Sequence, residues 1–132
     1  MKLDPGTFGG SPACKVLVQM MNNNIIPIGD KHRVLSFIND AIYQFKWLSS
    51  ISEYRVVERS MTLMRNYLDG QAAIMPYPWP FNSHLRNVIS YHHKRYLGLA
   101  NKTWKKKLGQ SLHKERKVGV AKHNLPANCR MP

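Results

Sequence analysis

The chain has 132 residues, of which 43% are hydrophobic, and its 20 lysines and arginines against 7 acidic residues give a formal net charge of +13. This length is typical of a single domain, and the apolar content is too high for a disordered chain. No apolar run reaches the roughly 20 residues of a membrane-spanning helix, and the two cysteines, Cys14 and Cys129, are too few for a disulfide scaffold or a four-ligand zinc site.

Residues 1–29 are predicted to form an N-terminal arm. Their first stretch, MKLDPGTFGGS, contains neither the apolar core of a secretory signal nor the arginines of a transit peptide. Ser11 followed by Pro12 is typical of a helix N-cap and a first helical residue. This pattern favours a short helix over residues 13–21, while two valines in the same stretch leave a short strand as the alternative.

Two amphipathic helices joined by a short turn are predicted next. Asp30 fits the N-cap of a helix over residues 31–48, whose apolar residues fall on one broad face. The sequence SISE, which begins at Ser50, has the spacing of a capping box and predicts a second helix that ends near Leu68, before Asp69-Gly70. The short joint predicts an αα-hairpin, and the wide apolar arc of the second helix indicates contact with more than one neighbour.

Residues 71–82 are predicted to be an extended, proline-rich strap. Prolines 76, 78 and 80 alternate with large side chains, and each proline restricts the residue before it. We favour a strap that packs over the hairpin and buries Tyr77, Trp79 or Phe81. The alternative is a ligand for a proline-recognition domain, but the segment lacks the polar flexible flanks that would present such a ligand.

A third helix is predicted over residues 83–97, before Gly98. Beyond it the apolar periodicity weakens, and one or two short helices are expected before a tail that begins near Lys114. The predicted fold class is therefore mainly α. A small helical body over residues 30–97 comprises the hairpin, the strap and the third helix, and a basic C-terminal extension follows over residues 98–132.

The positive charge is concentrated in the second half of the chain. Residues 1–69 carry 8 lysines and arginines against 6 acidic residues, whereas residues 70–132 carry 12 against Glu115 alone. The two halves therefore have net charges of +2 and +11, and a half at +11 repels itself unless an anionic partner compensates it. The candidate partners are nucleic acid, an anionic membrane surface and an acidic protein.

The basic run from Lys102 to Lys107 is the strongest local signal for nucleic acid. Cations bind phosphates, and the aromatic residues interleaved with them are candidates for stacking on bases. Lysines outnumber arginines in this half, which favours contact with the RNA backbone over base reading. The predicted nucleic-acid-binding residues are Lys94, Arg95, Lys102, Trp104, Lys105, Lys106, Lys107, Lys114, Arg116, Lys117 and Lys122.

Tyr43 and Trp47 are predicted protein-contact residues. They lie four apart, on the side of the first long helix opposite its apolar face. Exposed aromatic pairs of this kind anchor protein–protein contacts. The alternative is that the strap or the N-terminal arm covers them.

His84, His92 and His93 are the candidates for a metal site. A zinc-binding helix usually places two histidines four apart, whereas His84 and His92 are eight apart and the adjacent pair points about 100° apart. We expect no metal and no cofactor, with one of the adjacent histidines half-buried and the other at the surface. The chain also has no Walker-type phosphate loop and no compact nucleophile–base motif, so we expect no enzymatic activity and no small-molecule substrate.

These features predict a non-catalytic, intracellular subunit of a large ribonucleoprotein that contacts RNA, with rRNA favoured, and neighbouring proteins. A small body with a basic extension resembles the charge pattern of ribosomal proteins, and a mitochondrial particle is one candidate assembly. The alternative is an accessory subunit of a membrane-bound, respiratory-type complex, with the basic half on lipid headgroups or acidic neighbours. DNA binding is less favoured, because the second helix exposes few cations for groove reading.

Overall fold

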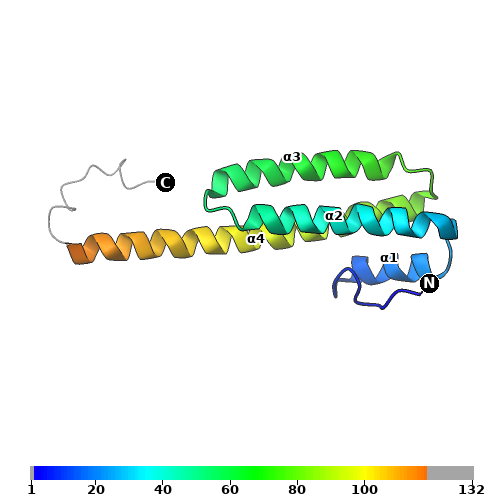
Figure 1. Cartoon of the computed structure of the whole chain (residues 1–132), viewed down its shortest axis with the longest axis horizontal. Helices are drawn as coiled ribbons and strands as arrows, with labels where there is room; N and C mark the ends of the chain where they lie inside the picture. Colours follow the sequence, from blue (N-terminus) through cyan, green and yellow to red (C-terminus); the bar gives the residue numbers. More distant parts are fainter. Residues whose placement is uncertain (1, 119–132) are drawn as a thin grey trace.

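The structure is a computed structural model that describes residues 2–118, with side chains up to Ser111. It contains α1 (Pro12–Asn22), a one-turn 3-10 helix η1 (Ile28–Asp30), α2 (Lys31–Ser49), α3 (Tyr54–Ala73) and α4 (Trp79–Val118). The described residues include no strand, so the prediction of a mainly α fold is confirmed. Figure 1 shows α2 and α3 as an antiparallel hairpin, α4 beside both helices, and α1 near the N-terminal part of α4.

The beginning of the chain is tied into this bundle. The Ser11 hydroxyl accepts a hydrogen bond from the Cys14 amide (3.2 Å) and Pro12 occupies the first turn, so a helix, not a strand, follows. The side-chain amide of Asn22 donates to the Leu3 carbonyl (2.9 Å) and accepts from the Leu3 amide (2.7 Å). These bonds hold the residues before α1 against its end.

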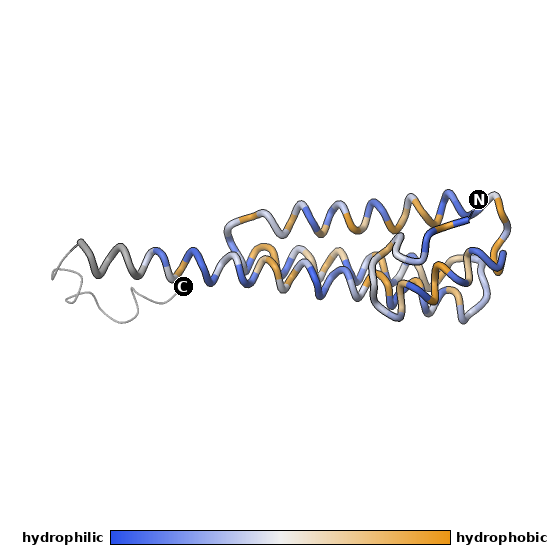
Figure 2. Tube along the Cα trace, turned by 90° about the horizontal axis from the view of Figure 1, so that it is seen from below, coloured by the Kyte–Doolittle hydropathy of each residue, from blue (hydrophilic) through white to orange (hydrophobic). Residues whose placement is uncertain are grey.

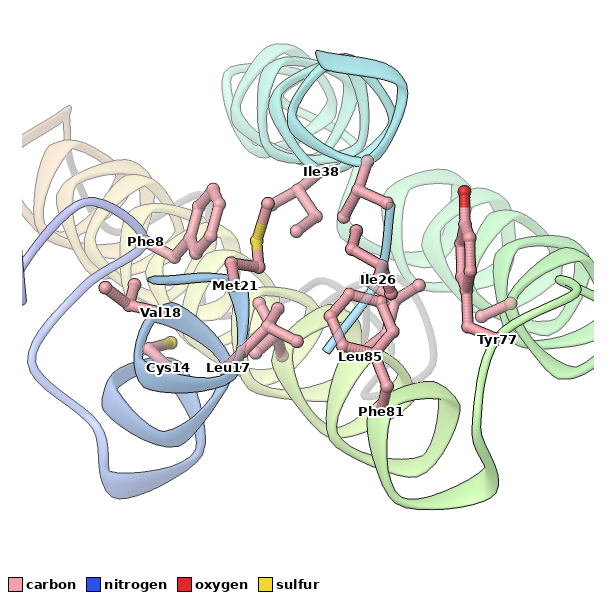
Figure 3. Close-up of a cluster of buried hydrophobic side chains, with 13 residues drawn as sticks. Phe8, Cys14, Leu17, Val18, Met21, Ile26, Ile38, Tyr77, Phe81 and Leu85 are labelled. Atoms are coloured by element: carbon pink, nitrogen blue, oxygen red, sulfur yellow. The ribbon is translucent and has the colours of Figure 1, made fainter. Parts of the chain in front are cut away.

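Two clusters of buried side chains lie along α4. The first joins Phe8 and α1 to the start of α2 and the first turns of α4, and Figure 3 shows Leu17, Met21, Ile38, Phe81 and Leu85 converging there. The second lies between the α2–α3 hairpin and the middle of α4. Its buried residues are Ala41, Phe45, Leu48, Val57, Met61, Leu68, Ile89 and Ala100. Since both clusters use α4, this helix is the common support of the molecule.

The turn between α2 and α3 differs from the predicted capping box. α3 begins at Tyr54, and Glu53, at its N-cap, makes no side-chain capping hydrogen bond. The hydroxyl of Ser50 instead donates to the Trp47 carbonyl (2.6 Å) and so satisfies the end of α2. A serine close to two helix ends can serve either one, and sequence spacing does not reveal which.

The helices on either side extend into the predicted strap over residues 71–82, and only residues 74–78 lie between them without helical structure. α3 continues through Gly70 to Ala73, and α4 begins at Trp79 with Pro80 in its first turn. A proline is tolerated there because the first turn of a helix needs no amide donor. Tyr77 and Phe81 are buried edge to face (5.4 Å between ring centroids), and Trp79 is exposed.

α4 is one continuous helix, where a helix ending near Gly98 and further short helices were predicted. It passes through Gly98 and Gly109 to Val118. Up to Trp104 it is supported by the hairpin, and beyond that point it projects past α2 and α3 (Figure 1). Figure 2 colours the turns of α4 just beyond the hairpin mostly as hydrophilic. None of the helices in the described part of the chain combines the length and apolar character needed to cross a membrane.

Candidate nucleic-acid interface

Nearly all the predicted nucleic-acid-binding residues lie on α4. Lys94, Arg95 and the run from Lys102 to Lys107 have described side chains on this helix, while Lys114, Arg116 and Lys117 belong to its backbone beyond the described side chains. Lys122 lies outside the described residues. As far as the structure describes it, the candidate interface therefore lies on one helix.

Five of these cations share one face of α4. With 3.6 residues per turn, Lys94, Arg95, Lys102, Lys105 and Lys106 fall within an arc of about 120°, opposite the side that buries Ala100. All five are exposed, and from Lys94 to Lys106 they span about 18 Å along the axis. We call this set the cationic face. Lys107 is also exposed but lies on another side of the helix.

The cationic face contains no acidic residue, and the first one on α4 is Glu115, nine residues beyond Lys106. No aspartate or glutamate occurs from residue 70 to residue 114. Asp69, on the neighbouring helix α3, already pairs with Arg65 of the same helix (3.7 Å). Uncompensated cations at this spacing form an extended positive surface that favours polyanions and weakens as salt is added.

The aromatic residues between the cations turn toward the protein. Trp104 is half-buried, and its ring lies 6.0 Å from that of Tyr54 at the start of α3. Tyr96 carries the Arg95 guanidinium 5.6 Å above its ring. Tyr91 packs edge to face on His92 (5.1 Å). The exposed face of α4 therefore presents cations and few free rings, an arrangement suited to phosphates more than to unstacked bases.

Both adjacent histidines are buried, so the prediction that one of them lies at the surface is wrong. Burial lowers the pKa of His92, the Phe8 carbonyl opposes this effect, and Arg95 adds to it. Burial also lowers the pKa of His93, with Arg65 and Lys94 lowering it further and Asp69 raising it. The two rings are neutral near pH 7. The described residues contain no cluster of three or more groups that could hold a metal ion.

Tyr43 and Trp47 are exposed on the outer side of α2, about one turn apart. Their exposed fractions of 66% and 56% show that neither the N-terminal residues nor the connection between α3 and α4 covers them. Their aromatic surface is thus open to solvent in the described structure. Their role as protein contacts remains a prediction.

A polar groove lies between α3 and α4. It is lined by Asp69, Ser83, Arg86, Asn87 and Ser90. Two serines and a carboxylate are present, but no histidine or cysteine lines the groove, so it lacks the usual nucleophile–base pair.

No protein-family model, no curated protein and no solved structure matches this chain. Its function is therefore argued from the charge, exposure and geometry of its own residues.

Proposed function

We propose that the chain is a non-catalytic structural subunit of a large, ribosome-like ribonucleoprotein and that it binds the RNA backbone through the cationic face of α4. The observation that carries this proposal is the alignment of five exposed cations on one helix face, with no acidic residue between residues 70 and 114. We further propose an intracellular particle, with the mitochondrion as the first compartment to test.

The spacing of the cations on α4 supports a partner of high negative charge. Lys102 and Lys106 are four residues apart, and like charges at this spacing destabilise an isolated helix. Helices shorter than about 12–15 residues are also marginal in water without tertiary contacts. Phosphates placed along the cationic face remove the repulsion, so binding stabilises the helix that makes the contact.

The packing of α4 favours a polyphosphate over a lipid surface. An amphipathic helix that lies on a membrane inserts its apolar face between the lipids. Most apolar residues of α4 from Phe81 to Ala100 are buried against α1, α2 and α3, and Leu99 is an exposed exception. One exposed leucine is little apolar surface for a membrane, whereas five exposed cations suit electrostatic contact with a phosphate backbone.

The test compares two variants of equal charge. Lys102→Gln/Lys105→Gln/Lys106→Gln removes three cations from the cationic face, and Lys2→Gln/Lys15→Gln/Lys46→Gln removes three exposed lysines elsewhere. Binding to a labelled RNA hairpin is followed by fluorescence anisotropy from 50 to 300 mM salt. We expect the first variant to lower the slope of log affinity against log salt by about 2–3, because each phosphate contact contributes about 0.7–0.9. The second variant should leave the slope nearly unchanged.

Anionic vesicles containing phosphatidylglycerol serve as the competing ligand in the same assay. Equal losses in the two variants would show that net charge, not the cationic face, drives binding. Tight vesicle binding with no affinity for the RNA hairpin would replace the proposal with the membrane-associated alternative.

A further inference from the structure

The solvent side of α3 carries a row of large apolar side chains. Val56, Leu63 and Tyr67 are 50%, 61% and 65% exposed, and Ile74, directly after the helix, is 75% exposed. The other apolar side of α3 is buried against α2 and α4. α3 is therefore apolar on two sides, and one of them meets no other element of the described structure.

The four side chains have the spacing of a helix–helix seam. Ser60 lies between Val56 and Leu63, and Gly70 lies between Tyr67 and Ile74, so the row advances in alternating steps of four and three residues. Residues at these intervals form one stripe that interdigitates with a facing helix. The stripe, defined by these six residues, is about 27 Å long.

The small residues leave space within the stripe. A Cβ added to Gly70 would meet no atom within 4 Å, so the volume above the helix is open there. Ser60 and Gly70, each placed between larger side chains, leave depressions that the side chains of a facing helix can fill. Apolar residues scattered at random over a surface would show neither this spacing nor these depressions.

The charge beside the stripe favours an acidic occupant. Arg59 is exposed and lies within one turn of both Val56 and Leu63. The acidic residues of α3 are engaged within their own helix: Glu58 accepts a hydrogen bond from the Tyr54 hydroxyl (3.2 Å), and Asp69 pairs with Arg65. A second copy of this chain, at +13, would bring like charge to the same surface.

We propose that this stripe docks an amphipathic helix of a partner protein whose apolar seam is flanked by glutamate or aspartate side chains. The apolar seam supplies the affinity, and the acidic flank, facing Arg59, sets the orientation and selects the partner. This inference rests on α3 alone and holds whether or not α4 binds RNA.

The probe is a labelled 21-residue helical peptide with leucine at the a and d positions of its heptads and glutamate at e and g. A matched peptide carries lysine at e and g. We expect the full chain to bind the glutamate peptide at least about tenfold more tightly than the lysine peptide, measured by fluorescence anisotropy. Equal affinity for the two peptides, or no binding of either, would overturn the proposal.

Variants of exposed residues locate the site. Leu63→Glu/Tyr67→Glu should weaken binding of the glutamate peptide by more than about tenfold. Ser36→Glu/Asn39→Glu, at two exposed positions of α2, adds the same charge and should leave the affinity unchanged. Arg59→Glu should reduce the preference for the glutamate peptide. Circular dichroism checks that each variant keeps its helices.

Sedimentation of the free chain tests whether a second copy of the chain, in place of an acidic partner, occupies the stripe. A monomer across the concentration range is the expected result. A dimer that Leu63→Glu/Tyr67→Glu dissociates would assign the stripe to a second copy and contradict the acidic partner. If the α2 variant weakened binding of the glutamate peptide as much as the α3 variant does, the binding would be nonspecific.

Discussion

At the scale of single residues, the burial of both His92 and His93 shows that other elements cover α4 on two sides. Adjacent residues of a helix point about 100° apart, so one neighbouring element can cover only one of them. His92 lies between Tyr91 and Tyr96 beside the N-terminal residues, and His93 packs on Phe45 of α2 (5.6 Å between ring centroids). The sequence predicted only one half-buried histidine, because the cover of the second one comes from a helix distant in sequence.

The buried pair predicts that acid destabilises the fold. The folded pKa of each histidine lies below its unfolded value of about 6.5, so the unfolded chain takes up protons first as the pH falls. The free energy of unfolding should be constant above about pH 7 and should fall between pH 7 and 5.5, a window above the titration of ordinary carboxylates. Urea unfolding at a series of pH values and fixed ionic strength measures this free energy.

Two histidine variants separate the contribution of the buried rings from that of histidines in general. His92→Leu/His93→Leu should flatten the dependence on pH, while His32→Gln, at an exposed position, should retain it. A free energy of unfolding that stays level or rises on acidification in the unaltered chain would show that the two rings are solvated in solution.

At the scale of elements, the periodicity of apolar residues predicted the helices but not where they end. The interpretation of Gly70 and Gly98 as helix ends followed a sound local rule, since glycine is the favoured residue after a helix. The rule fails here because buried residues lie beyond each glycine, Ala72 in α3 and Ala100 in α4. Their burial depends on contacts between helices, which no local pattern contains. The cations themselves could be listed from composition, but the cationic face was not predicted, because Lys94 and Lys106 share one face only if the helix continues through Gly98.

Alanine substitution tests these boundaries. A Cβ on Gly70 or Gly98 would meet no atom within 4 Å, and both residues lie in helix interiors. Gly70→Ala and Gly98→Ala should each raise the free energy of unfolding by about 0.5–1 kcal/mol. Gly9→Ala should lower it, because Gly9 has a φ of +119° and an added Cβ would lie 3.3 Å from the Tyr91 ring. Destabilisation by Gly70→Ala would indicate a helix end in the left-handed conformation, as the sequence suggested.

At the scale of the whole molecule, α4 joins two clusters that form one continuous structure. Phe37 packs against both clusters, and the second begins at Ile89, one turn after Leu85 of the first. The residues before α1 were predicted to belong to an N-terminal arm, but they contribute Phe8 to the buried interior. The bundle therefore depends on contacts between the first residues of the chain and a helix about 80 residues later, an arrangement of high sequence separation that composition cannot reveal.

Removing the Phe8 ring should therefore weaken the entire molecule. Phe8 is 1% exposed and Trp79 is 80% exposed, so they form a matched pair of large aromatic residues. Phe8→Ala should lower the free energy of unfolding by about 3–5 kcal/mol, Phe8→Leu by less, and Trp79→Ala by under about 0.5 kcal/mol. Urea unfolding followed by circular dichroism and by tryptophan fluorescence should give coincident transitions for each variant, because one cooperative unit unfolds. A loss for Phe8→Ala as small as that for Trp79→Ala would mean that the N-terminal residues detach from the bundle in solution. In that case the pH dependence assigned to His92 should also be weak, because the same residues cover its ring.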